Sequence, residues 1–128
     1  MAKKYRHERG QTLVLLLVFV MMAIAITTAA TFIIATNSTS TSNLSIGVTT
    51  KEMAETGVQK ALLALLRDPT FKGETFNIDT GTVTSTVSGT TTLTIDSMAV
   101  NGDFIKRVEV VATYSNNVLT VGSWKDIN

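Results

Sequence analysis

Residues capable of acid–base, nucleophilic or metal chemistry are few in this sequence and lie far apart. The chain of 128 residues has no cysteine, which excludes a disulfide, a thiolate nucleophile and a zinc–thiolate site. Its one histidine, His7, lies among the basic residues of the N-terminus, and any Ser/His/Asp triad would depend on it. The triplet Asp79-Thr80-Gly81 matches the short motif of aspartic proteases but has no second copy. We therefore expect no enzymatic activity, catalytic residue, metal site or cofactor.

The charges divide the chain into three parts. Residues 1–10 carry a formal charge of +3, residues 11–50 carry no charge, and residues 51–128 carry −2. The total of +1 argues against a strongly basic nucleic-acid-binding surface, and we expect no nucleic-acid contact. Basic residues next to an apolar segment mark the side that stays in the cytoplasm. The N-terminus is therefore expected in the cytoplasm and the body of the chain across the membrane.

The neutral part contains a long apolar run from Leu13 to Ala35, interrupted only by three threonines. As a helix the run would extend roughly 35 Å, enough to cross the hydrocarbon core of a bilayer. A buried core helix is not expected, because so small a body could not surround it. Two interpretations stay open, namely an anchor that persists and a signal peptide that is removed. Small-residue cleavage sites for a signal peptidase occur at 23–25 and at 28–30.

The next segments change from polar to amphipathic. Residues 36–50 are rich in Ser, Thr and Asn and are read either as a linker or as a polar helix. Residues 51–66 predict a helix, with Thr49 or Thr50 as its cap if it begins there, and Pro69 marks its end. One face of this helix forms an apolar stripe at helical spacing, which we expect to pack on a sheet: Ala54, Gly57, Val58, Ala61, Leu62 and Leu65.

Beyond Pro69 the hydrophobic period changes to two. β-branched runs at 82–87, 91–96, 106–114 and 118–124 predict strands, separated by turn residues such as Asn101-Gly102. Strands joined by such short turns must pair antiparallel. The predicted fold class is α+β, a long N-terminal helix packed on a small antiparallel sheet. The expected parts are a basic leader (1–10), a membrane helix (11–35), a polar-to-amphipathic continuation (36–68) and a β domain (69–128).

This layout resembles the type IV pilin and pseudopilin family. The specific motif is Glu8-Arg9-Gly10-Gln11-Thr12-Leu13-Val14, a short basic leader ending in Gly directly before an apolar helix. The stretch from Met53 to Leu62 is also similar to the amphipathic half of the helix in a subgroup of minor pilins. The resemblance implies that a prepilin peptidase cuts between Gly10 and Gln11 and that the new amine of Gln11 is methylated.

The sequence departs from the family pattern at several positions. Most members have Glu at the fifth mature residue, where it pairs with the terminal amine of a neighbour, and here that residue is Leu15. Losing this carboxylate removes an expensive charge from hydrocarbon. In the family, a pseudopilin that lacks the Glu is placed at the filament tip. The usual Phe or Met at the first mature position is Gln11, and the helix-breaking Pro of the apolar segment is missing.

Two functions of different classes follow as expectations. The first is a minor, tip-type or initiating pilin-like subunit of a pilus or secretion filament. Its partners would be the lipid bilayer, the prepilin peptidase, a membrane assembly platform, and other pilin or pseudopilin subunits bound through the N-terminal helix. The second is an anchored or secreted β domain that binds a surface ligand through exposed aromatic residues, which are alternatively part of the core: Phe71, Phe76, Tyr114 and Trp124.

Overall fold

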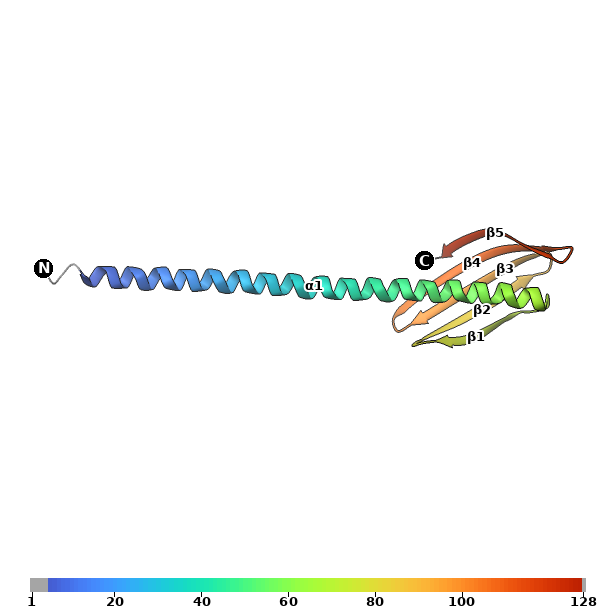
Figure 1. Ribbon diagram of the computed structural model, residues 1–128, viewed down its shortest axis with the longest axis horizontal. Helices are drawn as coiled ribbons and strands as arrows, with labels where there is room; N and C mark the ends of the chain where they lie inside the picture. The colour runs from blue at the N-terminus through green and yellow to red at the C-terminus, as the bar shows by residue number, and fades with distance from the viewer. Residues whose placement is uncertain (1–4, 128) are drawn as a thin grey trace. The chain divides into compact units, whose positions relative to one another are not determined.

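One helix and five strands make up the chain. The computed structural model describes the backbone of residues 5–127 and the side chains of residues 10–127. Helix α1 (Tyr5–Arg67) is followed by β1 (Gly73–Ile78), β2 (Gly81–Gly89), β3 (Thr92–Asn101), β4 (Phe104–Ser115) and β5 (Val118–Ile127) (Figure 1). Internal contacts divide the chain into two compact units, residues 1–42 and residues 43–128. The predicted α+β class is confirmed.

Helix α1 continues through the polar segment 36–50, for which the sequence left two alternatives. Thr36, Thr39 and Thr50 donate their hydroxyls to the carbonyl oxygens four residues earlier, at 2.7–3.1 Å. These bonds satisfy the hydroxyl groups without interrupting the helix. Thr50 therefore lies inside α1, where it is buried, and the helix cap considered at 49–50 does not exist. The helix ends at Arg67, two residues before Pro69, as predicted.

The strands form one antiparallel sheet in the order β1-β2-β3-β4-β5. The predicted strands are confirmed, with longer bounds, and β1 is an additional strand that the sequence analysis did not identify. Two-residue turns connect β1 to β2 at Asp79-Thr80, β3 to β4 at Gly102-Asp103, and β4 to β5 at Asn116-Asn117. A register shift between Val111 and Ala112 leaves Gly122 of β5 without a partner.

The core lies between the sheet and the C-terminal part of α1, within the unit of residues 43–128. Figure 1 shows this part of the helix over the middle of the sheet, with β1 and β5 outermost. Burying each large aliphatic side chain contributes roughly 1.5–3 kcal/mol. The largest fully buried aliphatic side chains are those of Val58, Leu65, Val83, Ile95, Val108 and Val110. The remaining face of the sheet, away from α1, is rich in threonine.

Candidate functional site

The predicted cleavage site lies within the first turns of α1. Gly10 and Gln11 are both helical and exposed, and no atom lies within 4 Å of a Cβ built on Gly10. A peptidase needs an extended backbone at the scissile bond, so this turn would have to open for a peptidase to cut there. Glycine favours helix less than alanine by roughly 1 kcal/mol, which makes position 10 a weak point. Of the basic leader, Lys3 and Lys4 lie outside the described residues.

The surface of the apolar run is uncovered. Every side chain from Gly10 to Ser45 is exposed, including Leu15, which is 73% exposed. The helix is long and apolar enough to cross a membrane. Exposed aliphatic and aromatic side chains at this density need a lipid or protein cover. The chain therefore carries a single N-terminal helix suited to membrane anchoring.

The three threonines of the apolar run do not present free hydroxyl groups. Thr27 donates to the carbonyl oxygen of Ala23 at 2.8 Å, Thr28 to that of Ile24 at 2.8 Å, and Thr31 to that of Thr27 at 2.9 Å. A hydroxyl that is bonded within its own helix can enter hydrocarbon without losing a hydrogen bond. The run thus behaves as a fully apolar segment despite its threonine content.

The predicted packing stripe of α1 faces the sheet. Ala54, Gly57, Val58, Ala61 and Leu65 are buried, and Leu62 is partly buried against the same core. At Gly57 the helix backbone lies against the side chains of the sheet. A Cβ built there would lie 2.1 Å from the Ser97 hydroxyl oxygen and 2.6 Å from a methyl carbon of Val83. Only a glycine lets the helix approach β2 and β3 this closely.

Ion pairs connect α1 to both outer strands. The Lys51 ammonium lies 2.6 Å from the Asp126 carboxylate of β5, and the Lys60 ammonium lies 3.0 Å from that of Glu74 in β1. The hydrogen bond and charge of Asp126 raise the pKa of Lys51. Lys60 also lies 3.9 Å from the ring centre of Phe76. These contacts fix the helix laterally across the sheet.

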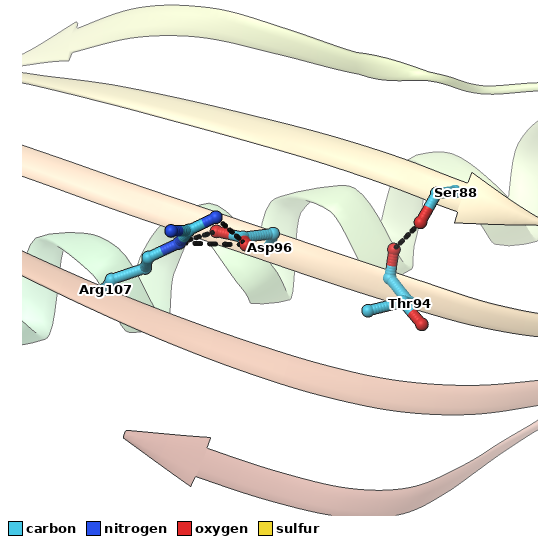
Figure 2. A network of polar contacts seen from close by, with 4 residues as sticks. All are labelled: Ser88, Thr94, Asp96 and Arg107. Atoms are coloured by element: carbon cyan, nitrogen blue, oxygen red, sulfur yellow. Dashed lines mark hydrogen bonds and ion pairs between the residues drawn. The ribbon is translucent and has the colours of Figure 1, made fainter. Parts of the chain in front are cut away.

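On the opposite face of the sheet, Arg107 of β4 binds Asp96 of β3. The Arg107 Nε lies 2.7 and 2.9 Å from the two carboxylate oxygens, and its Nη2 completes a bidentate pair (Figure 2). The hydrogen bond and charge of Asp96 raise the pKa of Arg107. Figure 2 also shows Ser88 bonded to the carbonyl oxygen of Thr94. Glu109 lies opposite Asp96 in the register, and its charge adds to the effect of Asp96 on the pKa of Arg107. The pair joins the neighbouring strands β3 and β4.

The aromatic residues divide between the two roles considered for them. Phe71, Phe76 and Tyr114 are partly buried against the core, whereas Trp124 is 44% exposed. Trp124 of β5 lies opposite Val110 of β4 in the register, so both side chains are on the sheet face that packs on α1. Val110 is fully buried there, whereas Trp124 is not. The helix does not reach far enough over β5 to bury this ring.

An open cleft lies where the β1–β2 and β3–β4 turns meet α1, with a volume of about 490 Å³. Asp79 and Asp103 line it, together with Thr80, Asn101 and Phe104. The two acids are far apart in the sequence, and the pairing of the strands brings them to one cleft. No set of three His, Asp or Glu side chains placed to bind a metal occurs within residues 10–127.

Comparisons with known proteins give no relative for this chain. No protein-family model, no curated protein and no solved structure matches it. The general shape of its parts, an apolar N-terminal helix whose later turns pack on an antiparallel sheet, is of the type IV pilin-like kind.

Proposed function

We propose that this chain is a minor pilin-like or pseudopilin-like structural subunit. It is inserted in the cytoplasmic membrane as a precursor, processed after Gly10, and assembled into a type IV pilus-like or secretion-type filament, or used to initiate one. The observation that carries the proposal is the position of the uncharged apolar run. It begins directly after a basic leader ending in Gly10, and the same helix continues to the residues that pack on the sheet.

The physical steps follow from the charge and exposure of α1. The leader, with its charge of +3, holds the N-terminus in the cytoplasm while the sheet lies outside. Cleavage removes this charge and leaves a helix without ionisable side chains between Gln11 and Thr50. Such a helix can leave lipid for a filament core of equally apolar helices. The transfer gains little hydrophobic free energy, so shape complementarity and mechanical work from an assembly platform must drive it.

Leu15 supports a tip or initiating position within this proposal. A shaft subunit places its fifth residue near the terminal amine of a neighbour, and a carboxylate is needed there to compensate the charge. Leu15 offers an apolar side chain that is 73% exposed on α1. A subunit with no neighbour above it has no amine to neutralise.

The test is the N-terminus of the mature protein, measured by intact mass and N-terminal sequencing after co-expression with a prepilin peptidase. A start at Gln11 is expected. Gly10→Leu should leave the precursor uncut, whereas Gly47→Leu, far from the leader, should not affect cleavage. A start near Ile26 or Thr31 would instead indicate ordinary signal-peptide removal and a secreted β module, and a precursor of unchanged length would contradict processing altogether.

A further inference from the structure

We propose that Asn101 is a site of self-modification, where the side-chain carboxamide is lost through a cyclic succinimide formed with the backbone nitrogen of Gly102. Asn101 is the last residue of β3, and Asn101-Gly102 is the one Asn-Gly pair in the sequence. Glycine is the residue that least obstructs this ring closure, because it has no Cβ. The inference does not depend on filament assembly.

The turn leaves the attacking nitrogen available. Asn101 pairs with Phe104, so Gly102 and Asp103 are the two central residues. Gly102 has a φ of 59°, and Asp103 is not among the residues with positive φ, which is the pattern of a type II′ turn. The first central N–H of such a hairpin takes no part in the strand ladder. The described residues form no other backbone hydrogen bond to it.

Space around the turn also favours ring closure. A Cβ built on Gly102 would meet no atom within 4 Å. The backbone at this tip can therefore rotate toward the Asn101 side chain without displacing packed neighbours. Ring closure requires this rotation, because Asn101 is held in an extended strand conformation while it pairs with Phe104.

A neighbouring hydroxyl is placed to assist the reaction. Thr80, in the β1–β2 turn, donates from Oγ1 to Oδ1 of Asn101 at 3.1 Å. Attack on Cγ transfers negative charge to this same Oδ1. A donor already aimed at an oxygen where charge develops stabilises the transition state. Thr80 is a positioning and polarising residue here, supplied by a turn that is distant in sequence.

The reaction balances with water as its only co-reactant. The Gly102 nitrogen loses its proton to solvent and bonds to Cγ, the bond from Cγ to Nδ2 breaks, and the amide nitrogen leaves as ammonia. Water then opens the succinimide at either carbonyl, producing Asp or isoaspartate at position 101. Either product adds a carboxylate to the cleft that Asp79 and Asp103 already line. Isoaspartate also lengthens the backbone of the β3–β4 turn by one methylene.

The experiment is peptide mapping by mass spectrometry of the full-length chain in detergent, incubated at neutral pH. Asn116 and Asn117 are internal controls, because they occupy another two-residue turn but precede Asn and Val. Asn101 should convert at least about tenfold faster than either control, because only it precedes a glycine. Thr80→Val should slow the conversion about fivefold, the worth of one hydrogen bond. Thr80→Ser, which keeps the hydroxyl, should restore the rate.

Three results would overturn the proposal. Equal conversion at positions 101, 116 and 117 would show that Asn101 is not a selective site, despite the glycine that follows it. An unchanged rate in Thr80→Val would remove the role of the hydroxyl. A rate difference between wild type and Thr80→Val that persists in denaturant would show that the effect does not come from the folded turn. Circular dichroism of each variant establishes that it is folded under the native conditions.

Discussion

Gly57 of α1 lies directly against Ser97 of β3, so closely that a methyl group at position 57 would come within 2.1 Å of the Ser97 hydroxyl oxygen. Both residues are buried, and the hydroxyl of Ser97 has no hydrogen-bond partner among the residues that the structure describes. The space between helix and sheet at this contact is too small for a methyl group. It predicts how the chain responds to changes on either side.

Gly57→Ala should destabilise the sheet-bearing part of the chain by about 1–3 kcal/mol, because the added methyl overpacks the contact. The effect should appear although alanine favours helix over glycine by roughly 1 kcal/mol. Denaturant unfolding in detergent, followed by Trp124 fluorescence, measures it. Gly47→Ala is the matched control, since its nearest atom is a Phe104 ring carbon 4.0 Å away. Similar losses at both positions would contradict the proposed contact.

Ser97→Ala should leave the chain equally stable or more stable by about 1 kcal/mol, because it removes a buried polar group without a partner. Ser85, opposite it in the register, donates to the carbonyl oxygen of Glu74 at 3.3 Å. Ser85→Ala should therefore be neutral or destabilising, by up to about 1 kcal/mol. The stability lost in the double variant Gly57→Ala/Ser97→Ala should be smaller than the sum of the changes in the two single variants, because residues 57 and 97 share one contact. Exact additivity would argue that the two residues do not touch.

Stability should fall at alkaline pH through Lys51. The hydrogen bond with Asp126, assisted by its charge, raises the pKa of Lys51 above its ordinary value of 10.5. A raised pKa means that the contribution is fully present below 10.5 and is lost as the pH rises through the folded-state value. Asp126→Asn should remove this part of the alkaline loss. Thermal unfolding measured as a function of pH gives the size of this loss. If wild type and Asp126→Asn lose the same stability at alkaline pH, the prediction is wrong.

Membrane insertion should depend on the apolar run and not on the polar segment after it. An aspartate at the centre of a membrane helix costs about 2.5–3.5 kcal/mol on insertion scales. Ile24→Asp should therefore reduce the fraction of chain that resists alkaline extraction from membranes. Ser40→Asp adds the same charge to the same helix beyond the run and should have little effect. If Ile24→Asp remains fully inserted, the run is not the membrane anchor.

The sequence by itself determined the features that arise within short segments. The absence of charge between Gln11 and Thr50, the helical stripe from Ala54 to Leu65 and the alternation of the later strands are all local patterns, so their periods predict helix and strand directly. The predicted antiparallel sheet follows from the short turns.

Tertiary structure decided what depends on residues far apart. Strand β1 is short and half-buried, and it is a strand because β2 pairs with it along its whole length, from Gly73 opposite Thr86 to Ile78 opposite Gly81. The composition of the polar segment 36–50 is compatible with either a helix or a linker. In the structure it is helical, and Thr36 and Thr39 donate their hydroxyls to carbonyl oxygens one turn earlier. The contact of Gly57 with Ser97 and the cleft shared by Asp79 and Asp103 depend on packing between distant elements, which hydrophobic periodicity does not encode.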